Sequence, residues 1–253
     1  MKSIRSAVKR FVPRSLLAAY GRERLRWDMA RSRGKPREKI FSDIYENNRW
    51  GGDPGTYDSG SGSRPDITGS YVSAIRAVIR REGVKRIVDL GCGDFEVSRR
   101  ILSPELSYVG CDVVPGLVAS NAARFASERV KFHNLDVVTD PLPTGDLCII
   151  RQVFQHLSNG DIATVLQKAR QYPLLVVTDE QVVGDNSDIN VDIIPYHGTR
   201  RLFGQGLRLE RGPFFERVEI LLEHSSGSEY SAISQTYLRT VLIRNNDGQS
   251  TGL

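Results

Sequence analysis

Short strand-like runs alternate with helix-like stretches from residue 67 to residue 245, and this alternation limits the folds open to the chain. The predicted strands are 86–90, 107–112, 131–136, 146–151 and 174–178. The predicted helices beside them are 70–82, 96–102, 116–126 and 158–171. Several of the strands are apolar along their whole length, which is typical of strands covered on both faces. Strands separated by helices therefore predict a parallel sheet between two helical layers.

The alternation stops near the C-terminus. Segments 217–223 and 238–244 have the composition of strands, and no amphipathic stretch of helix length lies between them. They are expected to form an antiparallel hairpin. The predicted fold class is thus α/β, a Rossmann-like, doubly wound, mostly parallel seven-stranded sheet with a C-terminal antiparallel hairpin, in one domain over 67–245. Residues 246–253 are expected to form a disordered tail.

The first predicted strand ends in the glycine loop Gly91-Cys92-Gly93-Asp94, at the edge of the sheet where ligands bind in α/β folds. Two glycines around a small residue let the backbone turn tightly against a nucleoside-type cofactor. A dinucleotide fingerprint needs a small residue where Glu96 stands, and Asp94 and Glu96 would repel a pyrophosphate at the start of the predicted helix. S-adenosylmethionine (SAM) has no phosphate, and carboxylates such as Asp89 attract its sulfonium and ammonium groups. The charges favour SAM.

Acidic residues also end the next two predicted strands. Asp112 lies 19 residues beyond Gly93, a spacing at which a carboxylate can accept both ribose hydroxyls. Asp136 ends the third strand and is placed to accept a hydrogen bond from an adenine amino group. Each aspartate alone could equally cap a helix or form a turn. Their succession after a glycine loop predicts one cofactor pocket along the edge of the sheet.

Together these features resemble the class I SAM-dependent methyltransferases over roughly residues 70–244. The resemblance rests on the loop 88–93, on Asp112 and Asp136, and on the C-terminal hairpin. It implies an enzyme that uses SAM as its cofactor and transfers the methyl group. No Asn/Asp-Pro-Pro-Tyr/Phe motif follows the fourth predicted strand, which disfavours methylation of DNA bases or of glutamine.

The resemblance also assigns individual residues. It puts Val137 beside the adenine, and Arg151 and Gln152 next to the methyl group. The segment 184–206, after the fifth strand, is where such enzymes build acceptor pockets. The predicted cofactor-binding residues are Asp89, Gly91, Cys92, Gly93, Asp112, Val113, Asp136, Val137 and Arg151.

A narrower resemblance concerns the acceptor. Bacterial small-molecule methyltransferases, often associated with surface-glycan genes, are similar to the segments 41–51, 59–63, 93–95, 112–115, 140–143 and 156–158. The segment 41–66 is open to two interpretations, a flexible linker rich in Gly and Ser, or a lid that closes over a ligand. A linker would leave the cluster Tyr45, Asn48, Arg49 and Trp50 unused in solvent, and the resemblance favours the lid.

The positive charge is concentrated in residues 1–40, which hold 13 Lys or Arg and 3 Asp or Glu, whereas the remainder carries a net charge of −5. This arm has apolar residues at helical intervals, so we expect a helical extension packed on the domain. Peripheral contact with an anionic membrane surface and a mitochondrial presequence are the alternatives. The mildly acidic body makes nucleic acid an unlikely partner.

Of the four histidines, His156 is the candidate general base, because it follows the fourth strand at the edge expected to hold the methyl group. The alternative is a structural histidine bonded to loop backbone. Cys92, Cys111 and Cys148 are widely spaced in predicted strands or at strand ends and are expected to be buried, without disulfides. No compact cluster of carboxylates and histidines predicts a metal site.

The sequence thus predicts SAM-dependent methyl transfer to a small-molecule or glycan acceptor, at oxygen rather than nitrogen. The rivals are an RNA or protein methyltransferase that uses the basic arm, and a SAM-binding partner subunit without activity. No apolar run approaches the roughly 20 residues that cross a bilayer, and the N-terminus is a poor match to a secretory signal. We therefore expect a cytoplasmic protein. The alternative is a cytoplasmic protein that contacts the membrane peripherally through residues 1–40.

Overall fold

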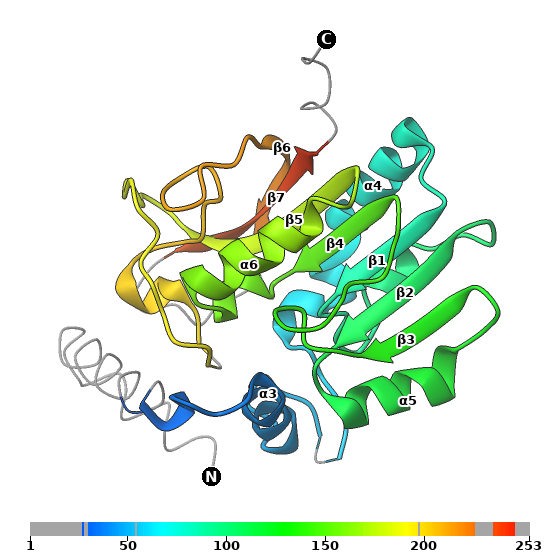
Figure 1. Cartoon of the computed structure of the whole chain (residues 1–253), viewed down its shortest axis with the longest axis horizontal. Helices are drawn as coiled ribbons and strands as arrows, with labels where there is room; N and C mark the ends of the chain where they lie inside the picture. The colour runs from blue at the N-terminus through cyan, green and yellow to red at the C-terminus, as the bar shows by residue number, and fades with distance from the viewer. Residues whose placement is uncertain (1–26, 28–29, 54, 197, 226–234, 246–253) are drawn as a thin grey trace.

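One mixed sheet runs through the molecule in the order β3-β2-β1-β4-β5-β7-β6 (Figure 1). Its strands are β1 (Arg86–Leu90), β2 (Ser107–Asp112), β3 (Val130–Asn134), β4 (Leu147–Arg151), β5 (Leu174–Val182), β6 (Glu219–Ser225) and β7 (Thr236–Arg244). This computed structural model describes residues 27, 30–53, 55–196, 198–225 and 235–245. The expectations for residues 1–26, for His197 and for the tail 246–253 fall outside these residues.

The pairing of the strands confirms the predicted fold class. Strands β1 to β5 are parallel, and β7 lies antiparallel between β5 and β6. Because β1 pairs with both β2 and β4, the chain leaves toward β3 on one side of β1 and returns on the other. The strand order therefore reverses between β1 and β4, and the loops that follow these strands diverge there. A ligand crevice is expected at this point.

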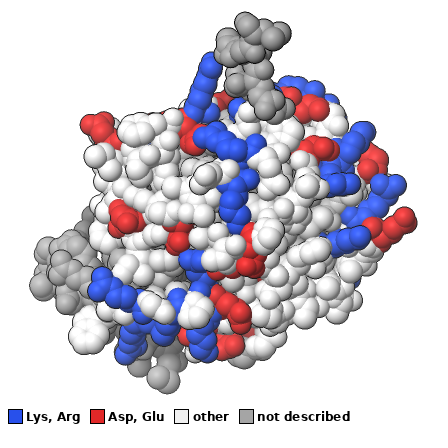
Figure 2. Space-filling view, viewed as in Figure 1, with Lys and Arg blue, Asp and Glu red and all other residues white. Residues whose placement is uncertain are grey.

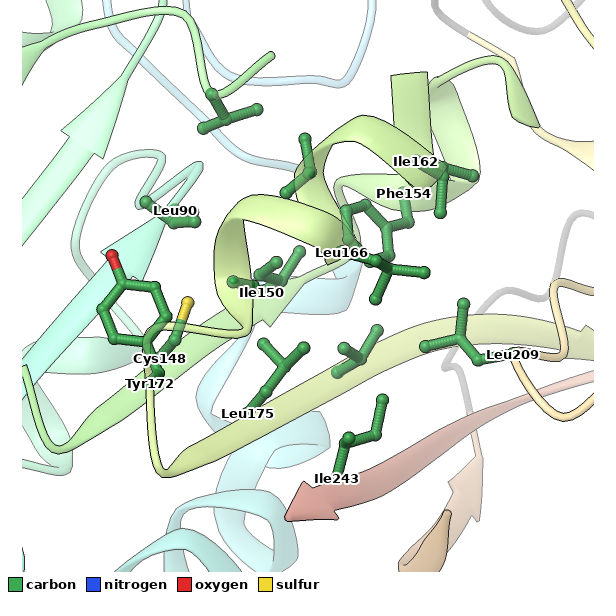
Figure 3. Close-up of a cluster of buried hydrophobic side chains, with 14 of the residues drawn as sticks. Leu90, Cys148, Ile150, Phe154, Ile162, Leu166, Tyr172, Leu175, Leu209 and Ile243 are labelled. Carbon is green, nitrogen blue, oxygen red and sulfur yellow. The ribbon is translucent and has the colours of Figure 1, made fainter. Parts of the chain in front are cut away.

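Helices cover both faces of the sheet. The described helices of the domain are α4 (Pro65–Glu82), α5 (Pro115–Phe125) and α6 (Asn159–Ala169). In Figure 1, α6 lies in front of β4 and β5, and α4 lies behind the sheet. The apolar face of α6 packs on β4 and β5 around Ile150, Leu166 and Leu175, which Figure 3 shows at close range. On the other face, α4 buries Tyr71 and Ile75 against β1 and β4.

Local sequence explains where these helices begin and end. Pro65 stands at the first position of α4, where its missing N–H costs nothing, and Gly83 ends the helix in a left-handed conformation. Ser158 caps α6, since its side chain accepts a hydrogen bond from the backbone N–H of Asp161. All three cysteines are free and buried, as predicted.

The helix predicted over 96–102 is wrong. Only a three-residue 3₁₀ helix, η2 (Ser98–Arg100), forms there. Phe95 has a left-handed backbone with φ of 67°, and its buried ring packs against Tyr108, Phe125 and Phe132. The left-handed conformation keeps residue 95 itself out of a right-handed helix, and burial of its ring holds the chain in the turn before η2.

The fifth strand is longer than predicted. It was expected to end at residue 178, but β5 continues to Val182 because β7 pairs with it along its whole length, to Val182 opposite Thr236. Asp179 and Glu180 therefore lie inside a strand, and both are buried. Neither acid is therefore part of a solvated turn after the strand.

The segment before the domain contains α3 (Arg37–Glu46), which lies below the sheet in Figure 1. The boundary expected between residues 40 and 41 falls inside this helix. Lys and Arg side chains gather over this part of the surface in Figure 2, at the lower left of the view. They include the exposed Arg31, Arg33, Lys35 and Lys39. No helix among the described residues is long and apolar enough to span a membrane.

Two isoleucines in strands test how the core is assigned. Ile149 in β4 is 1% exposed and Ile220 in β6 is 54% exposed. We expect Ile149→Ala to lower the free energy of unfolding by about 2–5 kcal/mol, because it leaves a cavity in the core. Ile220→Ala serves as the matched control and is expected to cost less than about 1 kcal/mol. Urea-induced unfolding of both variants measures the difference, and equal losses would contradict the assigned core.

Candidate active site

A cavity of about 540 Å³ lies at the carboxyl ends of β1, β2, β4 and β5, at the point where the strand order reverses. This volume falls in the range of small-molecule sites. The lining includes all nine residues predicted to bind cofactor and the candidate base His156. From the segment 41–66 it includes Phe41, Tyr45, Arg49, Trp50 and residues 58–60. The sequence-predicted residues are thus brought together at one site.

The glycine loop after β1 needs its glycines for both conformation and space. Gly91 and Gly93 have φ of 81° and 55°, where side chains are strained. A Cβ atom on Gly91 would lie 2.2 Å from Cγ2 of Val153, and one on Gly93 would lie 2.4 Å from Oγ of Ser59. Ser59 belongs to the lid segment, so the loop contacts the lid directly. Asp94 strengthens this contact, because its Oδ2 accepts the backbone N–H of Ser59 at 2.9 Å.

Every backbone N–H from residue 91 to residue 96 already has an acceptor. Those of residues 91 and 92 donate to the carbonyl of Cys111, and that of Gly93 donates to Asp112 Oδ2. The next three donate to the Ser59 hydroxyl, the Cys92 carbonyl and Asp94 Oδ1. A pyrophosphate site needs free amides at such a turn. The loop therefore lacks the free N–H donors of a dinucleotide site. This observation replaces the argument from the charges of Asp94 and Glu96, because the helix predicted over 96–102 does not form.

Asp112 joins the ends of two strands. Its Oδ2 accepts the N–H of Gly93 at 3.1 Å, and its Oδ1 accepts the N–H of Val114 at 3.1 Å. Burial raises the pKa of Asp112 to about 6, although both backbone hydrogen bonds oppose this shift. The carboxylate remains part of the cavity wall, where it can accept hydroxyl donors of a ligand.

Asp89 has a different environment. Its carboxylate accepts hydrogen bonds from the hydroxyls of Ser98 and Tyr108, and it is 2% exposed. Burial raises the pKa of Asp89, and the two hydroxyls act in the opposite direction. The group lies in the cavity wall and is held by the core beneath it. Its predicted attraction for the cofactor's positive groups stays a prediction.

Asp136, after β3, faces α3. Nε of Arg37 lies 3.0 Å from Oδ1 and 2.8 Å from Oδ2 of Asp136, and Nη1 of Arg37 lies 3.1 Å from Oδ1 of Asp161. The loop behind Asp136 is fixed by Lys168, whose ammonium donates to the carbonyls of Val137 and two neighbours. The end of the cavity where the sequence predicts the adenine therefore has two cationic side chains beside it, Arg37 and Lys168.

The end of β4 forms the floor of the cavity. The Arg151 guanidinium lies 5.0 Å from the centre of the Tyr71 ring and donates to the Gly62 carbonyl at 2.6 Å. Gln152 has φ of 57°, and a Cβ atom on Gly62 would lie 2.5 Å from its Oε1. The Ser-Gly run predicted to be a linker or a lid therefore packs closely on β4. This contact favours the lid over a free linker.

His156 lies in the 3₁₀ helix η3 (Phe154–His156) and is 7% exposed. Its Nδ1 donates to the Gly198 carbonyl at 2.9 Å, since a carbonyl can only accept. In the neutral imidazole with its proton on Nδ1, Nε2 is an acceptor; it faces Nε2 of Gln155 at 3.3 Å, while Oε1 of Gln155 accepts the N–H of Glu180. The Trp50 ring lies 5.4 Å from the imidazole and the Phe41 ring 6.3 Å. The base candidate is oriented by backbone and covered by lid aromatics.

The acids of β5 stand behind this histidine. Glu180 lines the cavity and binds the Thr199 hydroxyl at 3.2 Å and the Arg201 guanidinium at 3.1 Å. Asp179 accepts the N–H of Gln155, and burial raises the pKa of Asp179 to about 8. The segment 184–206 thus reaches the cavity through Gly198, Thr199 and Arg201. In the part of the chain that the structure describes, no group of three potential metal ligands occurs.

Sequence reasoning missed Arg37 and Gln155. Arg37, Phe41 and Tyr45 recur at intervals of four residues and all line the cavity from one face of α3. That spacing was a signal available in the sequence, but the boundary drawn after residue 40 separated Arg37 from the other two. Gln155 left no such signal, since its role depends on the contact with β5.

The residues fit SAM as a ligand. Gly91 and Gly93 line the cavity, and the wall offers carboxylate acceptors at Asp112 and Asp136. Hydroxyl, amino and ammonium donors, which SAM carries, match such acceptors. The absence of free amides in residues 91–96 counts against a phosphate group at the same loop.

Comparisons with known proteins agree with this fit. Residues 88–172 match a family model described as a methyltransferase domain. Human N-acetylserotonin methyltransferase, solved with SAM, is similar in structure, with a TM-score of 0.52 and 17% identity over 83% of this chain. This chain spans only 60% of the human protein. The N-methyltransferase NodS from Bradyrhizobium japonicum WM9, solved with S-adenosylhomocysteine (SAH), has a TM-score of 0.56 and 13% identity, covering 81% of this chain and 98% of its own. No curated protein matches the sequence.

The shifted pKa of Asp112 predicts how cofactor binding depends on pH. Ligand hydroxyls bind the ionised carboxylate, so affinity is full above a pKa of about 6 and is lost as the pH falls through it. We expect the dissociation constant of SAH to rise about tenfold between pH 7 and pH 5. Calorimetric titration at several pH values measures this change.

The matched control is Asp146, whose carboxylate also accepts two backbone N–H groups, those of Lys85 and Arg86, but at the opposite ends of the strands. Asp146→Asn is expected to keep the pH dependence, whereas Asp112→Asn is expected to bind weakly and without it. Unchanged SAH affinity in Asp112→Asn would contradict the cofactor assignment.

Proposed function

We propose that this chain is a class I SAM-dependent methyltransferase and that it transfers the methyl group of SAM to a hydroxyl oxygen of a small-molecule or glycan acceptor. The fold, the domain match over 88–172 and the glycine loop support the superfamily and the cofactor. The acceptor and the choice of oxygen depend on the cavity wall. His156 in the cavity wall is the observation that carries them.

The hydrogen bonds of His156 favour a base at oxygen. An amine acceptor is nucleophilic once it is neutral, whereas a hydroxyl gains more from a group that removes its proton. The Gly198 carbonyl keeps the proton of the imidazole on Nδ1, so Nε2 carries the lone pair. The contact from Gln155 to Nε2 is long, at 3.3 Å, and an acceptor hydroxyl can replace it.

The remaining side chains orient the reactants and exclude water. When bound, SAM supplies a methyl group activated by its sulfonium. His156 accepts the hydroxyl proton at Nε2, and Trp50 and Phe41 cover the imidazole from the lid side. Shielding by these rings keeps water from competing with the acceptor for the methyl group.

The size and polarity of the cavity support a small acceptor. A space of about 540 Å³ accommodates the cofactor together with a limited part of a second molecule. Glu180, Thr199 and Arg201 offer acceptors and donors of the kind that sugar hydroxyls use. A folded macromolecule would have to present one protruding group through the lid. The basic arm, on which an RNA or protein acceptor would rely, lies mostly outside the described residues.

A methylation assay tests the proposal. The purified protein, with SAM carrying a labelled methyl group, is incubated with cell extracts fractionated into lipid, glycan, small-molecule, RNA and protein pools. We expect label in the glycan or small-molecule pool, with mass spectrometry of the purified product placing the methyl group on oxygen. Label in RNA or protein would overturn the proposed acceptor. Binding of SAM without any labelled product would favour the non-catalytic partner subunit.

Replacing the candidate base separates catalysis from folding. We expect His156→Gln to lower kcat by about 10²–10⁴, the usual contribution of a general base, while SAH affinity stays within about twofold. His133→Gln is the control, since His133 is exposed on β3 and does not line the cavity. Steady-state kinetics and calorimetric titration of both variants provide the measurements. A parallel loss of SAH binding in His156→Gln would make the histidine structural.

A further inference from the structure

Arg37 joins three segments of the chain with one side chain. It lies in the first turn of α3, pairs with Asp136 after β3 and pairs with Asp161 in the first turn of α6. The side chains of Arg37 and Asp136 are each 20% exposed and that of Asp161 is 17% exposed, so solvent screens these pairs only in part. A guanidinium is suited to such bridging because its donors have a fixed planar geometry.

The Arg37–Asp136 pair also separates two spaces. Both residues line the main cavity, and both line a second cavity of about 560 Å³. The second cavity lies between residues 34–38 and residues 134–140. Breaking the pair would join the two spaces at the end of the site where Asp136 stands.

The two partners in this contact are held by different parts of the molecule. Lys168 holds the loop of Asp136 by donating to three of its carbonyls. Arg37 belongs to α3, which lies outside the sheet and presents Arg37, Phe41 and Tyr45 to the cavity. Phe41 contacts Trp50 and His156, so a shift of Arg37 along with its helix moves the cover of the candidate base.

We propose that Arg37 acts as a latch, a side chain whose ion pairs hold the lid closed. These pairs close the Asp136 end of the cavity behind the cofactor and hold the aromatic cover over His156. Opening the latch joins the two cavities and gives the cofactor a path to its site. Closing it restores the pair with Asp136 and Asp161 and completes the wall against which the acceptor binds. Cofactor binding then precedes acceptor binding. The inference rests on SAM as the cofactor in the proposed function, and it does not depend on which acceptor is used.

The rate at which SAH leaves the protein tests the latch. Trp27→Phe makes Trp50 the only tryptophan, so its fluorescence reports the lid. In that background we expect Arg37→Gln to release SAH about tenfold faster in stopped-flow displacement, since affinity changes between related complexes arise mostly in the dissociation rate. We also expect the SAH complex of this variant to expose Trp50 more to acrylamide quenching.

Three further variants keep the result interpretable. Lys39→Gln on the same helix is the control, because Lys39 is exposed and its ion pair among the described residues is with Asp43, and this variant is expected to behave as the parent. Asp161→Asn removes one end of the bridge without touching Asp136, and it is expected to speed SAH release by a smaller factor. Arg37→Lys keeps the positive charge but loses the planar guanidinium that bridges two carboxylates. The rate of SAH release from this variant is expected to lie between those of the parent and Arg37→Gln.

Unchanged or slower SAH release in both Arg37→Gln and Asp161→Asn would overturn the latch. Slower release would identify Arg37 as a group that competes with the cofactor for Asp136. If Arg37→Gln fails to fold, Asp161→Asn decides alone. A parent protein that binds SAH but methylates no acceptor would refute the proposed function and leave the latch measurement intact.

Discussion

The carboxylate of Asp112 connects the two strands on which the site depends. It accepts one N–H from the glycine loop after β1 and one from the turn after β2, so this buried group, together with the Cys111 carbonyl, sets the relative position of these loops. Its ionisation is costly in this environment, which is why its pKa rises to about 6. The carboxylate is nevertheless placed here, where it lines the cavity. The glycine loop that Asp112 holds in place also carries the contact with Ser59 of the lid segment.

Much of the fold follows from local sequence, and particular residues show why. Strands β1, β2 and β4 were predicted within a residue of their bounds, because strands covered on both faces are apolar throughout and stand out from their neighbours. The loop at 91–93 and the acids at 112 and 136 were predicted as one site because parallel strands bring their carboxyl ends to one edge. These inferences need only periodicity and strand direction.

The rest depends on contacts between distant residues. Arg37 is 99 residues from Asp136 and 124 from Asp161, and nothing in the sequence near Arg37 indicates either partner. The length of β5 depends on β7, which follows it by more than fifty residues, and this pairing places Asp179 and Glu180 in a strand. The helix expected over 96–102 fails because Phe95 packs into an aromatic cluster that periodicity does not reveal. Tertiary packing outweighed local propensity in each case.

The lid and the Gly198–Arg201 wall come from opposite ends of the domain in sequence, whereas the cofactor edge lies between them. The family match covers 88–172, which contains the glycine loop, Asp112, Asp136 and His156 but neither the lid nor that wall. Both outer segments are tied to the central one, the lid through the hydrogen bond from Ser59 to Asp94 and the wall through the Gly198 carbonyl, which accepts from His156. Substitutions in the two outer segments would therefore reshape the cavity while the residues of the central segment stay the same.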